Sequence, residues 1–200
     1  ANVKAGRDVT DFVSLCDLAP TFLQAAGVDI PADMTGKSLM TILESDKSGR
    51  VEASRDHVLV GKERHVPSQE APDMGGYPCR AIRTDDFMYI RNYEPNRWPN
   101  GTPNYEKAAV KNTWSGDTDN GPTEPYKIEN NAKNADHLRK DPHRLNNVAD
   151  DPEYAKTRRA LADRLTAMLK ATGDPREVGG AEKFDKFPYL GGGPKYPGKK

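Results

Sequence analysis

The chain has 200 residues, enough for one large domain or two small ones with a sizeable core. Its 30 basic and 30 acidic side chains give a formal net charge of zero. A chain without net charge has no strong overall field, which argues against nucleic acids and anionic membranes as partners. Hydrophobic residues are only 35% of the chain, and no apolar run approaches the roughly 20 residues that span a bilayer. We therefore expect a thin core, long loops and no membrane segment.

The two cysteines, Cys16 and Cys79, are too few and too far apart in sequence for a disulfide framework or a zinc site. We expect two buried free thiols, although a single bridge between them stays open. The cysteine content therefore does not define the redox compartment.

The first 56 residues show the pattern of an α/β unit. Residues 11–15 are apolar and partly β-branched, which predicts a strand. Asp17 is placed to cap a helix over 18–26 that Gly27 would end. A second short helix is predicted over 35–43, before a charged loop.

From residue 57 onward the pattern is that of strands. Residues 57–60 form a continuous apolar run typical of a covered strand. The runs 79–84 and 87–93 are separated by Asp85 and Asp86, which predicts a β-hairpin. Apolar side chains occur on both faces of the second run, so we expect the sheet to be covered on both sides.

The remainder of the chain contains one strongly patterned helix. Residues 94–150 are rich in proline and polar residues, with Trp98 and Trp114 as isolated large apolar groups that we expect to pack on a neighbouring surface. Asp151 and Pro152 then begin a helix predicted over about 152–172. We expect residues 176–200 to form an extended tail.

No arrangement of residues predicts self-contained catalysis. The chain has no Gly-x-Ser-x-Gly motif, and neither cysteine lies in a catalytic context, so we assign no catalytic residue. The adjacent carboxylates at 85–86 and 150–151 are better explained as a turn and a helix cap than as metal ligands. We therefore assign no metal site.

One cluster of charged residues follows the strand at 57–60 and continues at the start of the hairpin. If the two strands are neighbours, its cations and imidazole lie together, an arrangement suited to sulfate, phosphate or carboxylate oxygens. The alternative is a set of loop charges paired with the nearby acids Glu63, Glu70 and Asp73. The candidate substrate-binding residues are Lys62, Glu63, Arg64, His65, Tyr77 and Arg80.

Several stretches, taken in order, resemble the type I sulfatases, which use a formylglycine nucleophile. Residues 13–23 read VSLCDLAPTFL and residues 36–39 read GKSL, both similar to the end of that family's catalytic domain. Residues 140–149 read KDPHRLNNVA, similar to the segment before the family's last helix. GKERH at 61–65 and YPCRAIR at 77–83 resemble a subgroup that includes sulfoglucosamine sulfohydrolase-like enzymes.

The resemblance implies an alkaline-phosphatase-like α/β fold. Residues 1–56 would be the last strand and helix units of the catalytic domain. Residues 57–175 would be a C-terminal subdomain in which a small antiparallel sheet packs with a long helix. The implied activity is hydrolysis of sulfate esters or N-sulfamates, on a sulfated carbohydrate or an aryl sulfate. The six candidates would then contact the substrate at the pocket wall.

The family's cofactors, calcium and formylglycine, are not expected on this chain. The formylglycine motif Cys/Ser-x-Pro-x-Arg is mimicked only by residues 93–97, which begin with Tyr93. Asp119 and Asn120 mimic a metal-binding segment but follow residues 13–23, whereas the family's own segment precedes them. We therefore expect these groups on a missing N-terminal catalytic part, and no turnover by the isolated chain.

Other hypotheses stay open at this point. The chain would be a non-catalytic module that binds sulfated glycan or has a structural role, or part of an esterase or phosphatase of the same superfold. The resemblance implies a periplasmic or extracellular location. If the chain is a fragment, residues 58–60 with Val13, Leu15 and Phe22 lack the central sheet that they would normally contact. We then expect exposed apolar surface and self-association.

Overall fold

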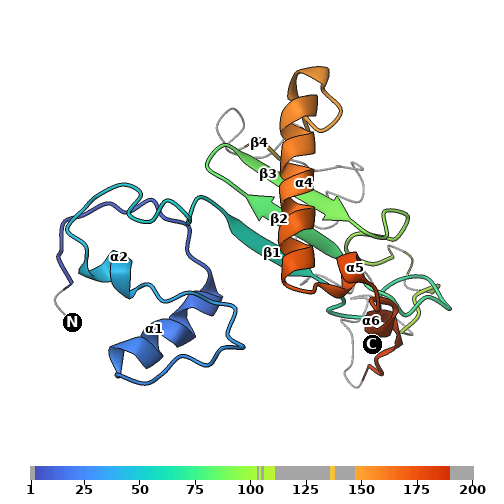
Figure 1. Ribbon diagram of the computed structural model, residues 1–200. Coiled ribbons are helices and arrows are strands. Elements are labelled where there is room, and N and C mark those ends of the chain that lie inside the picture. The colour runs from blue at the N-terminus through green and yellow to red at the C-terminus, as the bar shows by residue number, and fades with distance from the viewer. Residues whose placement is uncertain (1–2, 103, 105, 111–135, 138–146, 190–200) are drawn as a thin grey trace. The chain divides into compact units, whose positions relative to one another are not determined.

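The computed structural model describes residues 3–102, 104, 106–110, 136–137 and 147–189. It forms two compact units (Figure 1). The first unit is Ala1–Leu59 with Arg83–Asp85, and the second is Val60–Ile82 with Asp86–Lys200. The expectations for Trp114, for the turn at 119–120 and for residues 140–146 lie outside the described residues.

The first unit is built from short helical segments. The 3₁₀-helix η1 (Leu15–Asp17) continues into α1 (Leu18–Ala25), and α2 is Met40–Glu44. Ser14 begins η1 as the first residue of a capping box, with its backbone N–H donating to the Asp17 carboxylate at 3.0 Å. Gly27, at φ 70°, follows the end of α1 as predicted.

The predicted strand over 11–15 is wrong. Asp17 is the N-cap residue of α1 as predicted, but its carboxylate makes no capping bond to that helix. The side chain of residue 11 and the backbone of residue 12 bond to a loop instead of to a neighbouring strand. The Asp11 carboxylate accepts from the amides of Val51 and Glu52 at 2.7 Å each, and the Phe12 N–H donates to the Arg55 carbonyl at 2.9 Å. These bonds turn the segment into η1, which starts at Leu15.

The predicted helix over 35–43 forms only from Met40 onward. The residues before it are held in a non-helical conformation by bonds to η1 and α1. Asp17 accepts from the Lys37 N–H at 2.8 Å, and the Thr21 hydroxyl accepts from the Leu39 N–H at the same distance.

The sheet of the structure contains β1 (Val58–Lys62), β2 (Cys79–Arg83), β3 (Phe87–Asn92) and β4 (Asp136–His137), in the order β1-β2-β3-β4. β3 and β4 are antiparallel, with Phe87 opposite His137. The predicted hairpin is confirmed as β2 and β3. Arg80, Ala81 and Ile82 of β2 are all buried, and because consecutive strand residues point to opposite faces, both faces of β2 are covered. The expected cover of the whole sheet is only partial, because no residue of β3 is buried and Val60 of β1 is 53% exposed.

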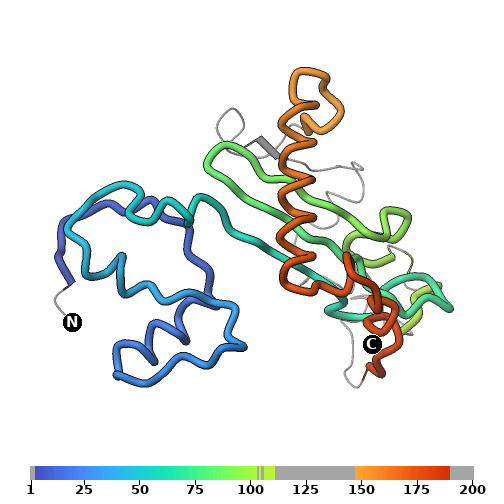
Figure 2. The backbone as a smooth tube through the Cα atoms, in the orientation of Figure 1, coloured from blue at the N-terminus to red at the C-terminus, as the bar shows by residue number. Residues whose placement is uncertain are grey.

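The long C-terminal helix is confirmed as η2 (Pro152–Tyr154) followed by α4 (Ala155–Ala171). The Asp151 side chain caps it by accepting from the Glu153 N–H at 2.9 Å. α4 packs against β3 and runs across the sheet, as the tube in Figure 2 shows. Leu165 and Leu169 of α4 and Ile82 of β2 belong to the buried core of the second unit.

The segment from 174 to 189 contains two short helices and is not extended, a correction to the first part of the tail predicted over 176–200, whose residues 190–200 lie outside the described residues. It contains α5 (Pro175–Val178) and α6 (Glu182–Lys186). Asp174 starts α5 by accepting from the Arg176 N–H at 2.9 Å. We call residues 174–187 the C-terminal clasp, because its charged groups bind loops of the sheet.

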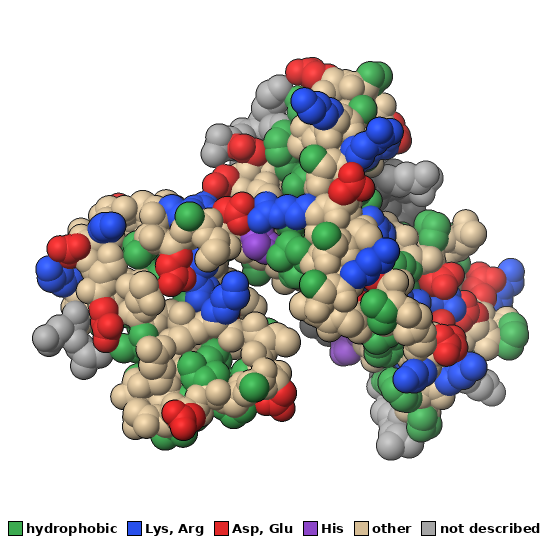
Figure 3. Space-filling model, in the orientation of Figure 1, with side chains coloured by type: hydrophobic (Ala, Val, Ile, Leu, Met, Phe, Trp, Pro, Cys, Tyr) green, Lys and Arg blue, Asp and Glu red, His purple; other side chains and the backbone are tan. Residues whose placement is uncertain are grey.

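Several hydrophobic side chains of the first unit are exposed, as expected for a fragment. Val13, Leu15 and Phe22 are 50%, 85% and 66% exposed, and green side chains lie on the surface of this unit in Figure 3. Both cysteines are free thiols, but Cys16 is exposed and Cys79 only partly buried, so the expected burial is wrong for Cys16. In the described ranges, no helix combines the length and apolarity needed to cross a membrane.

Candidate substrate-contact site

The candidate residues at the end of β1 and the start of β2 are brought together because these strands are neighbours, as the cluster hypothesis required. Arg80 lies along the backbone of β1. Its Nη1 donates to the Lys62 carbonyl at 3.2 Å, and a Cβ on Gly61 would lie 3.1 Å from its Cδ. Glycine at position 61 therefore makes room for the arginine stem.

Arg80 is only 8% exposed, and it makes five hydrogen bonds, one for each of its N–H groups. Its Nε donates to Asp174 Oδ2 at 2.7 Å, and its Nη2 donates to Glu63 Oε1 at 2.7 Å. The other bonds reach Asp174 Oδ1 and the carbonyls of Lys62 and Cys79. Arg80 thus has no N–H group left for a substrate.

Glu63 joins Arg80 to the C-terminal clasp. Arg176 donates from Nη2 to Glu63 Oε2 at 2.7 Å and from Nε to Oε1 at 3.2 Å. The Arg176 guanidinium carbon also lies 5.9 Å from the ring centre of Tyr93 and 5.6 Å from that of Phe184. One carboxylate is therefore shared by two arginines from distant parts of the sequence.

The pKa of Asp174 lies below its ordinary value. Burial alone would raise this pKa. The hydrogen bonds from Arg80 and from the Arg176 amide, together with the charges of both arginines, lower it by more than burial raises it. Asp174 is therefore ionised near neutral pH, as its bonds to Arg80 require.

The Arg64 side chain bonds to different groups from those that bind Arg80. It donates to the carbonyls of Met74 at 3.0 Å, Asp185 at 3.4 Å and Phe187 at 2.5 Å. These bonds tie residue 64 to its own loop and to the clasp. The expected single cluster of three cations and an imidazole is thus divided, and Arg80 pairs with acids, among them Glu63, as the alternative predicted.

The remaining candidates are more accessible. Among the six, His65 alone is exposed, while Lys62 and Tyr77 are half-buried. Burial, and after it the charge of Cys79, raises the pKa of the Tyr77 phenol, so that it remains a neutral hydrogen-bond donor. Gly76 fixes the return of the loop, because a Cβ there would lie 2.6 Å from the Glu63 carbonyl oxygen.

Sequence reasoning missed the acidic and basic partners in the clasp. It also did not predict the cavity of about 220 Å³ beside this loop, although Glu70, Asp73, Trp98 and the motif at 93–97 had each been considered separately. The lining residues are Gln69, Glu70, Asp73, Asn96, Arg97 and Trp98. No local pattern marks them, since they come from two loops that only the tertiary structure brings together.

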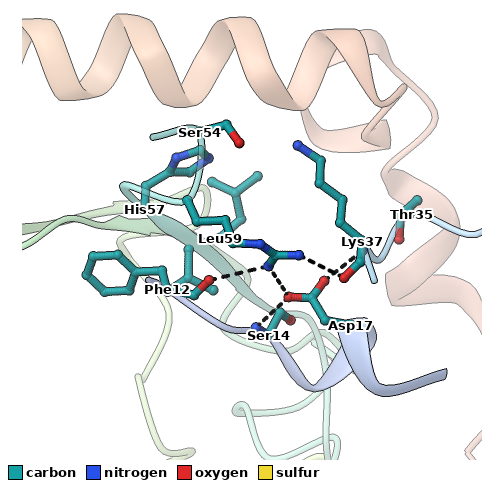
Figure 4. A pocket seen from close by; sticks show the side chains of 10 residues that line it. Phe12, Ser14, Asp17, Thr35, Lys37, Ser54, His57 and Leu59 are labelled. Carbon is teal, nitrogen blue, oxygen red and sulfur yellow. Dashed lines mark hydrogen bonds and ion pairs between the residues drawn. The ribbon is translucent and has the colours of Figure 1, made fainter. Parts of the chain in front are cut away.

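A second cavity, of about 130 Å³, lies within the first unit around a buried ion pair (Figure 4). Arg55 Nη1 donates to Asp17 Oδ2 at 2.8 Å, and Arg55 Nη2 donates to the carbonyls of Lys37 and Ser38 at 2.9 and 3.0 Å. Burial raises the pKa of Asp17, but its bonds from backbone amides and Arg55 lower it more, for a net decrease. These bonds make the pair a structural link between α1 and the loop before α2.

The carboxylates weighed as metal ligands and the tyrosine of the mimic motif have other partners in the structure. Within the ranges that the structure covers, no three His, Cys, Asp or Glu side chains group closely enough to hold a metal ion. Asp85 binds Arg50 through both oxygens at 2.8 Å, and Asp151 caps the long helix. Tyr93, which stands at the nucleophile position of the mimic motif, donates from its hydroxyl to Glu177 at 2.5 Å.

The family described as N-sulphoglucosamine sulphohydrolase, C-terminal, matches residues 1–100. The chain belongs to this family. It is 26% identical over 180 residues to an ulvan-active sulfatase of Formosa agariphila, covering 86% of this chain and 32% of the relative. It is also 26% identical over 168 residues to an N-acetylglucosamine-6-O-sulfatase of Bacteroides thetaiotaomicron, covering 84% and 23%. This sulfatase-family chain therefore spans a third or less of both relatives.

Solved structures agree with the sulfatase assignment. One, described as a complex with its substrate D-glucosamine-2-N,6-O-disulfate, has a TM-score of 0.50 and 26% identity, covering 80% of this chain and 25% of that one. A 2-O GAG sulfatase has the same TM-score and coverage at 21% identity, which shows the fold alone. The resemblance to sulfatases is thus confirmed.

Proposed function

We propose that this chain is the C-terminal part of a sulfatase that hydrolyses sulfate esters or N-sulfamates of a sugar. The observation that carries the proposal is the family match over residues 1–100. The likeness to a sulfatase solved with a disulfated glucosamine supports a sulfated sugar as the substrate class. The formylglycine and calcium of the parent family would be supplied by a preceding catalytic part, and the parent enzyme would be exported to the periplasm or the exterior.

In this proposal the second unit forms a wall of the substrate pocket. The loop that starts at Glu63 is held by Arg80 and Arg176 at its beginning, and Arg64 ties it to the clasp. His65 follows these anchored residues directly and is exposed. We assign His65, Lys62 and Tyr77 to substrate contact, and Glu63, Arg64 and Arg80 to positioning.

The charges support this division of roles. A sulfate oxygen accepts hydrogen bonds from N–H and O–H groups, and Arg80 uses all five of its N–H groups within the protein. His65, Lys62 and Tyr77 carry an imidazole, an ammonium and a phenol, all of which can donate to an anionic oxygen.

The test is replacement of His65 in the parent enzyme. His65→Ala should lower kcat/KM for a sulfated monosaccharide by about tenfold or more, since a hydrogen bond to a charged group is lost. The melting temperature should not change, because His65 is exposed. Arg158→Ala, at a partly exposed site on α4, is the control and should leave kcat/KM unchanged. Unchanged kinetics of His65→Ala would contradict the assigned contact.

A second measurement tests where the nucleophile lies. The isolated 200-residue chain should not hydrolyse an aryl sulfate above background, with or without calcium. Any such hydrolysis would overturn the proposal that the nucleophile is carried elsewhere. Binding of sulfated glycan by a parent protein that lacks Cys/Ser-x-Pro-x-Arg would instead favour the non-catalytic module.

A further inference from the structure

The cavity between residues 69–73 and 96–98 has the composition of a sugar-binding subsite. Trp98 is 46% exposed at its edge, although an indole of this size is usually much more buried. Asn96 is also exposed, and its side-chain amide makes no hydrogen bond within the described part of the chain. An aromatic face beside an amide and partly exposed carboxylate groups suits a ring with both C–H and O–H surfaces.

The cavity walls are rigid. Trp98 is held by Gln69, whose side-chain nitrogen donates to the Trp98 carbonyl and whose oxygen accepts from the Trp98 N–H, both at 2.8 Å. Arg97 donates to Asp73, to the Gly76 carbonyl and to Asp185 at 2.8, 3.2 and 2.9 Å. Groups that are already fixed lose little entropy when a ligand binds.

The charge of the cavity argues against a sulfated occupant. Glu70 and Asp73 are acidic and partly exposed, at 40% and 38% of their side-chain surfaces. The one arginine of the lining, Arg97, has its guanidinium directed to two carboxylates and a carbonyl. Carboxylate oxygens accept hydrogen bonds from hydroxyl groups but repel sulfate.

We propose that this cavity binds one uncharged sugar ring of the glycan, stacked on Trp98 and hydrogen-bonded by Asn96, Glu70 and Asp73. The inference rests on the proposed function, because the ring bound in this cavity would be the neighbour, in the same glycan, of the sulfated ring. A volume of about 220 Å³ is below the roughly 300 Å³ at which drug-sized pockets begin, so one ring fits better than a longer chain. We therefore expect the parent enzyme to prefer a sulfated oligosaccharide to a sulfated monosaccharide.

The kinetic test uses the parent enzyme with two substrates. Trp98→Ala should lower kcat/KM for a sulfated oligosaccharide by about tenfold, or about 1.4 kcal/mol, because the aromatic contact with the sugar ring is lost. It should leave kcat/KM for the sulfated monosaccharide unchanged, and Trp98→Phe should recover most of the loss because it retains a flat face. Equal losses on both substrates would indicate a structural role and overturn the proposal, as would no loss on either.

A binding test separates this proposal from the proposed activity. The parent protein is titrated calorimetrically with a panel of neutral, desulfated oligosaccharides, which does not require hydrolysis. Binding that Trp98→Ala weakens about tenfold supports the subsite even if no sulfate ester is cleaved. The subsite is overturned if no oligosaccharide of the panel binds, or if Trp98→Ala does not weaken binding. Either result holds even if the enzyme is an active sulfatase.

Discussion

Arg80 and Asp174, which are 94 positions apart in sequence, form an ion pair at 2.7 Å that attaches the C-terminal clasp to the second strand of the sheet. Both side chains are largely buried, with 10% and 15% of their surfaces exposed. Glu63 extends the pair to Arg176, so that the loop carrying His65 and the clasp are held by the same charges. The stability and the position of this loop therefore depend on the clasp.

Replacement of Asp174 should destabilise the protein strongly. Asp174→Ala leaves Arg80 partly buried without one carboxylate and removes the cap of α5, which should cost about 2–4 kcal/mol of the free energy of unfolding. The control is Asp150→Ala, because Asp150 is 99% exposed in its pair with Arg158 and should change stability little. Urea denaturation measures both; equal effects of the two substitutions would show that the buried pair is not important.

Stability should fall in acid. The pKa values of Asp17, Asp174 and Glu177 lie below their ordinary values of 3.8, 3.8 and 4.5. Because the folded protein binds these protons less tightly than the unfolded chain, the stabilisation is complete above the ordinary values and is lost as the pH falls through and below them. Melting temperatures measured between pH 7 and pH 2 should show this loss, with a smaller acid loss in Asp174→Ala than in the unmodified protein.

Stability should also fall at high pH, for a different group. Burial, and then the hydrogen bond to Glu177, raises the pKa of Tyr93 to about 12. The folded state therefore retains this proton more tightly than the unfolded chain, so the stabilisation is present below the ordinary pKa of 10 and is lost between about 10 and 12. Tyr93→Phe should lower stability at neutral pH and lose less of it on alkaline titration. An identical alkaline loss in the variant would refute the assignment to Tyr93.

Two glycines of the candidate site should differ in their tolerance of a methyl group. At Gly76 an added Cβ would lie 2.6 Å from backbone atoms of residues 63 and 64, so Gly76→Ala should cost about 2 kcal/mol or more. At Gly61 the nearest atom is 3.1 Å away on the flexible Arg80 side chain, so Gly61→Ala should cost less than about 1 kcal/mol. Thermal denaturation of both variants gives the comparison, and the reverse order would contradict the loop geometry.

The exposed apolar side chains of the first unit should cause the isolated chain to associate. Leu15→Glu combined with Phe22→Glu should reduce association, because charges replace side chains that are 85% and 66% exposed. Val178→Glu, at a residue that is 57% exposed in the second unit, controls for the added charge. Sedimentation velocity measures the mass; a monomeric unmodified chain with a sharp cooperative melt would contradict the expectation.

The sequence predicted which strands carry the residues of the candidate site, but not the groups to which those residues bond. The polar motif after β1 and the arginine at the start of β2 indicated a shared location, and the neighbouring strands confirm it. The partners that decide each role could not be predicted, because Asp174 and Arg176 are far away in sequence, and Arg176 belongs to the segment that was expected to be an extended tail. The predicted strand at 11–15 failed for a related reason. A strand needs a partner, and Asp11 instead binds the loop amides of Val51 and Glu52.

The sequence by itself determined the elements whose stabilising contacts are local. The hairpin of β2 and β3 follows from two β-forming runs around a turn, and the helix after Asp151 follows from a cap and a proline within three residues. Only the tertiary structure decided which charges pair and which remain exposed. A buried ion pair requires short distances between residues that are far apart in sequence. A sequence pattern gives their spacing along the chain but not their distance in space.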